Sequence, residues 1–322
     1  MGVAPDAATT VTARPFRFGI GPGGVRLRSA AQWRELARRA EGLGYATLSV
    51  GDHVGQYGPV AALAAAAAAT SQLRVSALTL ANDYRHPVVL AQEAATLDVV
   101  SDGRLELGLG AGWMRSDYEG LGIPMDAAST RIDRLEESVA VLKALLAGEE
   151  LTFHGRHYTI DGVKIAPAPV QHPRPPLLIG GSGPRILTLA AAEADIVGLN
   201  VSLHGGALSE AGGETASREA TERKVALVEQ VAGPRARDIE LEVYVHVTMV
   251  GDDRDAALRR AVNVLRLDAE RALASPHALV GSVGEVVDAL EERRGAFGMS
   301  YVSIDAGAMD EFAPVVARLA GT

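Results

Sequence analysis

The chain has 322 residues, 48% of them hydrophobic and 4% aromatic, and a formal net charge of −9. This apolar content is enough for a sizeable core built mainly from Ala, Val and Leu. The acidic balance, with no run of Lys and Arg, argues against a nucleic-acid partner. Because the sequence contains no Cys, disulfides, thiolate zinc sites and cysteine nucleophiles are excluded.

The amino-terminal segment has neither the basic nor the apolar region of a signal peptide. We therefore expect a disordered leader over residues 1–15 and a cytoplasmic protein. The longest apolar tract, residues 60–70, is rich in Ala and about half as long as a membrane helix needs to be. This tract is predicted to be a helix packed on strands, and no membrane partner is expected.

Short β-branched runs alternate with longer helical patterns from one end of the chain to the other, which is typical of βα units around a parallel sheet. Eight strands separated by helices predict an α/β protein with a closed (β/α)8 TIM barrel, forming a single domain over residues 16–322. The expected strands are 16–20, 46–52, 73–81, 104–110, 176–181, 195–201, 239–250 and 301–307.

The intervening segments include amphipathic helices, such as residues 30–44 and 87–103. Three longer segments do not fit the regular alternation and are predicted to be insertions, at about 113–130, 149–175 and 202–217. The second insertion has the pattern of a hairpin followed by a Pro-rich stretch, and the third is rich in Gly and Ser.

Active sites of such barrels lie at the carboxyl ends of the strands, so residues that follow each strand are the candidates for chemistry. Asp52 and His53 place a carboxylate and an imidazole at the end of the second strand, where they could hold or donate a proton near neutral pH. The alternative is a loop histidine beside a helix-capping aspartate. No spacing of His, Asp or Glu suggests a metal site.

The segment 177–187 runs from a strand through small residues into a helix. Backbone N–H groups at Gly180, Gly181 and Ser182 could bind a phosphate, with Arg185 adding a positive charge. An ordinary tight turn between strand and helix explains the same pattern equally well.

The glycines of segment 108–113 match part of a dinucleotide-binding pattern, but the βαβ context and the acidic partner are missing, so a Rossmann site is rejected. Trp113 follows these glycines and is a candidate wall for a flat cofactor or substrate. Simple packing under the loop is the alternative. Tyr84, which follows the third strand, is a second candidate for the substrate pocket.

Together, the segments 49–53 (SVGDH), 77–122, 154–171 and 175–185 (PPLLIGGSGPR) resemble the luciferase-like monooxygenase superfamily. Within it, they are most similar to the actinobacterial type of F420-dependent oxidoreductases. The resemblance covers nearly the whole chain from Arg14. It implies a deazaflavin or flavin across the barrel mouth, with its ring at the end of the third strand and its phosphate at the turn after the fifth.

The resemblance also implies a non-prolyl cis peptide under the ring, at Ala77–Leu78, and places Asp52 and His53 near the redox carbon. A homodimer formed through barrel helices is expected on the same basis. The residues that the resemblance assigns to the cofactor are Ala77, Leu78, Asn82, Gly110, Ala111, Gly180, Gly181 and Ser182.

The predicted activity is hydride transfer between C5 of coenzyme F420 and a small organic substrate, with His53, assisted by Asp52, handling the proton. Sugar-phosphate dehydrogenases of this superfamily carry a catalytic Glu just after the fourth-strand glycines, where this chain has Trp113. Reduction of a C=C or C=N bond is therefore favoured over sugar-phosphate oxidation. The alternatives are an FMN-dependent monooxygenase and a non-catalytic barrel that binds a deazaflavin.

Overall fold

The computed structural model describes residues 14–23, 25, 27–203 and 208–322. Most of the predicted leader and the middle of the third predicted insertion therefore lie outside the described residues. In the described part of the chain, no helix combines the length and the apolar character needed to cross a membrane.

Eight parallel strands close into a barrel, as predicted. The sheet order is β3-β2-β1-β13-β10-β9-β8-β5, and pairing of β3 with β5 closes the ring. A two-residue strand, β4 (Leu80–Ala81), extends β3 after a break and also pairs with β5. The barrel strands are β1 (Arg17–Gly21), β2 (Thr47–Val50), β3 (Arg74–Ala77), β5 (Leu105–Gly110), β8 (Leu177–Gly181), β9 (Ile196–Leu199), β10 (Glu240–Tyr244) and β13 (Met299–Asp305).

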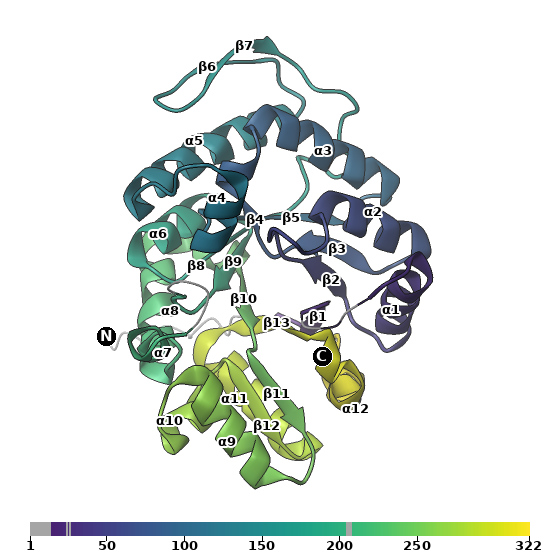
Figure 1. The fold of residues 1–322 in the computed structure, drawn as a ribbon, viewed down its shortest axis with the longest axis vertical. Coiled ribbons are helices and arrows are strands. Elements are labelled where there is room, and N and C mark those ends of the chain that lie inside the picture. The colour runs from purple at the N-terminus through teal and green to yellow at the C-terminus, as the bar shows by residue number, and fades with distance from the viewer. Residues whose placement is uncertain (1–13, 24, 26, 204–207) are drawn as a thin grey trace, which may run out of the picture.

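Helices surround this barrel (Figure 1). Several begin with Pro at their first position, where the missing N–H costs nothing. The Ala-rich tract forms one of them, and its small side chains at Ala66 and Ala67 are buried, which allows close packing on the strands. The barrel helices are α1 (Ala30–Gly42), α2 (Pro59–Ala69), α3 (Pro87–Val100), α5 (Ala128–Leu146), α6 (Pro184–Glu193), α8 (Arg218–Ala232), α11 (Val283–Phe297) and α12 (Met309–Leu319).

Each of the three predicted insertions contains a helix or strands of its own. The predicted hairpin is present as antiparallel β6 (Leu151–His154) and β7 (Thr159–Val163), which lie outside the ring of helices (Figure 1). The insertion after β5 contains the short helix α4 (Arg115–Leu121), and the one after β9 contains α7 (Glu210–Glu214).

The single strand expected over residues 239–250 is wrong. The chain leaves the barrel after β10, and β11 (Val247–Val250) pairs in parallel with β12 (Ala278–Gly281) in a separate small sheet. Helices α9 (Arg254–Leu265) and α10 (Ala269–Ala274) pack on this sheet and form a second apolar cluster beside the barrel (Figure 1). The alternating pattern runs through both strands, so nothing in the sequence marks the change of sheet.

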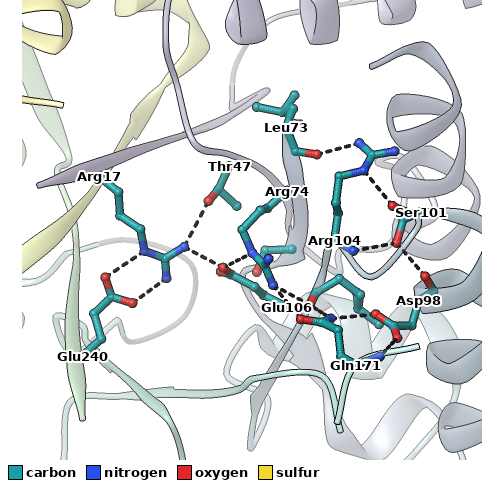
Figure 2. Close-up of polar contacts among 12 residues, drawn as sticks. Arg17, Thr47, Leu73, Arg74, Asp98, Ser101, Arg104, Glu106, Gln171 and Glu240 are labelled. Carbon is teal, nitrogen blue, oxygen red and sulfur yellow. Dashed lines mark hydrogen bonds and ion pairs between the residues drawn. The ribbon is translucent and has the colours of Figure 1, made fainter. Parts of the chain in front are cut away.

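A network of charged side chains, partly or fully buried, occupies the amino-terminal end of the barrel (Figure 2). The Arg17 guanidinium donates to both carboxylate oxygens of Glu240, at 2.7 and 2.6 Å, and to Glu106 at 2.6 Å. Arg74 donates to the same oxygen of Glu106, also at 2.6 Å. These residues lie at the starts of four different strands, so the network ties the strands together at the end opposite the predicted active site.

Candidate active site at the mouth of the barrel

A cavity of about 730 Å³ lies at the carboxyl ends of the strands. The segments that follow β2, β3, β5, β8, β9 and β10 all contribute to its wall. Most residues predicted from the sequence line it, whereas Ala77 and Asn82 are buried outside its lining. The predicted residues that line the cavity are Asp52, His53, Leu78, Tyr84, Gly110, Ala111, Trp113, Gly180, Gly181 and Ser182.

His53 is held by a carboxylate other than the one predicted. Its Nδ1 lies 2.7 Å from Oδ2 of Asp117, a buried residue of α4. Asp52 instead accepts two hydrogen bonds from the Arg85 guanidinium, at 2.5 and 3.1 Å, and one from the Ala81 N–H at 3.1 Å. The expectation that Asp52 assists His53 directly is therefore wrong, because neighbouring residues of an extended segment point to opposite sides of the chain.

The pairing with Asp117 determines which nitrogen of His53 can react. Because the carboxylate accepts the Nδ1 proton, Nε2 is the nitrogen that can exchange a proton with a ligand in the cavity. The Trp113 indole lies edge-on to the imidazole, with ring centroids 5.4 Å apart and an angle of 83°. Burial, followed by the charge of Asp117, raises the pKa of Tyr84 above its usual range, so this phenol stays protonated.

The cis peptide lies at Leu78–Thr79, one residue later than predicted. The resemblance indicates the segment, but it does not fix the position to a single residue in a strand that breaks between β3 and β4. The Thr79 side chain packs on Gly110, where a Cβ would lie only 2.6 Å from Thr79 Oγ1. This close approach explains why glycine is required at that point of the cavity wall.

The turn between β8 and α6 forms another part of the wall. A Cβ at Gly180 would lie 2.8 Å from Asn200 Nδ2, and one at Gly181 would collide with the Ile186 side chain. The helix N-terminus that follows has no side-chain cap. Pro184 at its first position has no N–H, so the donors open to a ligand are those of the residues that follow, and the helix dipole favours a negatively charged ligand.

Arg185 does not supply the positive charge predicted at this turn. Its guanidinium forms an ion pair with Asp133 and donates to the Ser129 carbonyl at 2.9 Å. The side chain is half exposed and is directed to α5, because it belongs to the outer surface of α6 and not to the cavity lining.

The model of the luciferase-like monooxygenase family matches residues 12–299. The chain belongs to this family. The F420-dependent glucose-6-phosphate dehydrogenase of Microbacterium testaceum is 33% identical over 190 residues, which cover 56% of this chain and 55% of the relative. The FMNH(2)-dependent dimethylsulfone monooxygenase of Pseudomonas putida is 30% identical over 128 residues, covering 40% of this chain and 35% of the relative. The chain thus spans about half the length, or less, of the curated relatives it matches.

Two solved structures superpose on nearly the whole chain. The monooxygenase RslO1 of Streptomyces bottropensis gives a TM-score of 0.71 at 27% identity, covering 94% of this chain and 97% of that one. The coenzyme F420-dependent tetrahydromethanopterin reductase of Methanopyrus kandleri gives 0.77 at 18% identity, covering 96% and 100%. The latter likeness supports the luciferase-like barrel fold alone.

Sequence reasoning missed three groups at this luciferase-like site. Asp117 lies in an insertion without a recognisable pattern. Arg131, a buried residue of α5, donates to the carbonyls of Ala111 and Gly112, both at 3.2 Å, and so holds the glycine turn after β5. His246 was hidden in the overlong predicted strand; burial lowers its pKa to about 4, so it lines the cavity as a neutral imidazole.

Within the described residues, no three His, Asp or Glu side chains come close enough to hold a metal ion. The cavity wall offers three kinds of group to a ligand: an imidazole bound to a carboxylate, an indole ring, and the N–H groups at the turn between β8 and α6.

Proposed function

We propose that this chain is an F420-dependent oxidoreductase that transfers hydride between the deazaflavin C5 and a small organic substrate. The observation that carries the proposal is the His53–Asp117 pair on the wall of a cofactor-sized cavity. Membership of the luciferase-like family and similarity to proteins named as F420-dependent support it.

The cavity fits such a cofactor. Its volume of about 730 Å³ is within the usual range for small-molecule and cofactor sites. Gly180, Gly181 and Ser182 would hold the phosphate at the uncapped start of α6, while Leu78 and Gly110 would contact the ring. When bound, the deazaflavin supplies the site for hydride at its C5.

The chain's own contribution is to handle the proton and to orient the substrate. His53 Nε2 donates a proton to the substrate, or accepts one from it, and Asp117 stabilises the imidazolium form. Asp52 forms an ion pair with Arg85, so it is part of the cavity wall without presenting an unpaired charge.

We favour an unsaturated C=C or C=N bond over a sugar phosphate as the reacting group. Apolar side chains form part of the cavity lining, namely those of Trp113, Met114, Met125 and Ile132, and Arg115 also lines the cavity. Arg131 also reaches the lining, but its N–H groups are already bound to main-chain carbonyls, so it is not free to bind a substrate phosphate.

The first test is to measure binding of coenzyme F420 and, separately, of FMN by ultrafiltration of the purified protein. Tight F420 binding with weak FMN binding supports the proposal. Preference for FMN favours the second candidate, an FMN-dependent monooxygenase, to which the similarity with the dimethylsulfone monooxygenases points. Binding of neither cofactor contradicts both, and leaves the fold assignment unchanged.

A further inference from the structure

A carboxylic acid lies in the interior of the barrel, next to the cavity. Glu242 of β10 is fully buried, and it is paired in register with Gly198 of β9. A Cβ at Gly198 would lie 3.3 Å from Glu242 Oε2 and 3.1 Å from the Cα of Gly180, whose residue lines the cavity. The missing side chain of Gly198 leaves space between the Glu242 carboxyl group and the backbone of Gly180, which is part of the cavity wall.

This acid has no partner that compensates a charge. Neither oxygen of Glu242 has a hydrogen-bond partner of ordinary geometry within the described chain. The Ser303 hydroxyl is near enough to lower the pKa of the acid, but it does not form a hydrogen bond of ordinary geometry with it. The nearest cation, Arg17, is already bound by Glu106 and Glu240. A buried carboxylate in such a position costs much more free energy than the neutral acid.

The groups around Glu242, on its own strand and on neighbouring strands, have opposing effects on its pKa. Burial, the largest influence, raises its pKa to about 7 from the ordinary 4.5; Ser303 and Arg17 lower it, and the charges of Glu240 and Glu106 raise it. The side chain is thus the neutral acid in mildly acidic solution and becomes charged as the pH passes neutrality.

We propose that Glu242 is a positioning residue whose neutral carboxyl group keeps this wall of the cavity uncharged, so that an anionic ligand binds well only while Glu242 is protonated. The ligand part of the inference rests on the proposed function, because a phosphate-bearing deazaflavin is such an anion. A negative charge in this weakly screened interior repels the ligand, and binding of the ligand in turn favours protonation of Glu242.

The first test uses the ligand-free protein. Glu242→Gln replaces the neutral acid with an uncharged side chain of the same size. In the unfolded wild type Glu242 loses its proton near pH 4.5, and in the folded protein it does so only near pH 7. The folded state therefore loses stability as the pH rises from about 4.5 to about 7. The melting temperature of the variant should therefore exceed that of the wild type by an amount that grows across this window and is constant above it.

Glu150→Gln, a change at an exposed position before β6, is the matched control and should follow the wild type at every pH. Infrared absorption gives a second readout: a protonated carboxyl band should be present in the wild type at pH 6 and reduced in Glu242→Gln. The proposal is overturned if the melting temperatures of the wild type and Glu242→Gln differ by the same amount at every pH and the protonated carboxyl band is equal in both proteins. Poor expression of one variant would not change this conclusion.

The second test measures binding of coenzyme F420 between pH 6 and pH 8.5. The affinity of the wild type for F420 should fall roughly three- to tenfold over this range. In Glu242→Gln, the decrease in affinity that is centred near pH 7 should be mostly absent. Lys224, whose pKa burial lowers to about 8, is unchanged in the variant and accounts for a later fall.

The two proposals fail in different ways. If the wild type binds no F420, the proposed function fails while the melting and infrared experiments still test Glu242. If F420 binds with the same pH dependence in both proteins, the proposed function stands and the role of Glu242 in ligand binding is wrong.

Discussion

Two carboxylates at the mouth of the barrel differ in their hydrogen-bond partners. Asp117 accepts from the His53 imidazole, whereas Asp52 is tied to the Arg85 guanidinium. Substitution of each should therefore affect a different property of the protein. Removing the charge of Asp117 acts on the proton-transfer group, and removing that of Asp52 leaves a partly buried arginine without its partner.

Asp117→Asn is expected to lower kcat by roughly 10- to 100-fold with little change in cofactor affinity, because His53 loses the group that stabilises its charged form. Asp52→Asn is the control, and should alter stability or cofactor affinity while lowering kcat much less than Asp117→Asn does. An unchanged kcat in Asp117→Asn would remove the pair from the mechanism.

The sequence points to His53 because a residue just after a barrel strand has a known place at the mouth. It does not point to Asp117, which follows 64 positions later and reaches the imidazole only through the packing of α4. Arg131 was missed for a related reason, since a single arginine in a helix gives no sign that it will turn inward to main-chain carbonyls.

At the scale of elements, two glutamates on helices each fix a neighbouring segment. Glu41 of α1 accepts the consecutive N–H groups of residues 71–73, at 2.6–2.9 Å, just before β3. Glu137 of α5 accepts those of residues 156–158, at 2.7–3.1 Å, in the turn between β6 and β7. The hairpin is thus attached to the barrel helices through its turn as well as by packing.

Glu137→Ala is expected to speed amide hydrogen exchange at residues 156–158 while leaving the melting temperature nearly unchanged, because only the hairpin turn is released. Although burial alone would raise the pKa of Glu137, the N–H donors, that of His157 first, lower it below 4.5. The attachment should therefore hold above this pH and be lost in acid as the carboxylate takes up its proton. Equal exchange in Glu137→Ala and in the exposed control Glu136→Ala would contradict this role.

The predictability of elements differs for a physical reason. The hairpin was predicted because its alternation is flanked by glycine and proline, whereas the β10–β11 junction was missed because one alternating run continues through it. A change of sheet depends on long-range pairing with residues 278–281, and no local pattern in a run of Val, Tyr and Thr encodes such a partner.

At the scale of the whole molecule, the two ends of the barrel have separate tasks. The βα rhythm was sufficient to predict the closed ring, because each strand and helix repeats the same local pattern. The ion pairs around Arg17 at the opposite end from the cavity could not be predicted, since they join side chains from strands far apart in the sequence.

Arg17→Met is expected to lower the free energy of unfolding by roughly 3–5 kcal/mol, because the buried Glu106 and the partly buried Glu240 would each lose a partner. Denaturant titration measures this loss. Arg39→Met, which breaks an exposed ion pair with Asp310, should change stability by at most about 1 kcal/mol. At pH 5.5, where Glu242 is the neutral acid in both variants, cofactor affinity per folded molecule should be the same; a specific loss of affinity in Arg17→Met at this pH would mean that the two ends are coupled in another way.

The two tryptophans differ in their surroundings in a way that gives the protein a built-in optical probe. Trp33 is buried in α1, with its indole N–H bound to the Ala62 carbonyl, whereas Trp113 meets the His53 ring at the cavity. A protonated imidazole quenches indole emission, and a neutral one does so much less. With Trp33 replaced by Phe, the emission of the remaining tryptophan reports the charge of His53 directly, before any substrate has been identified.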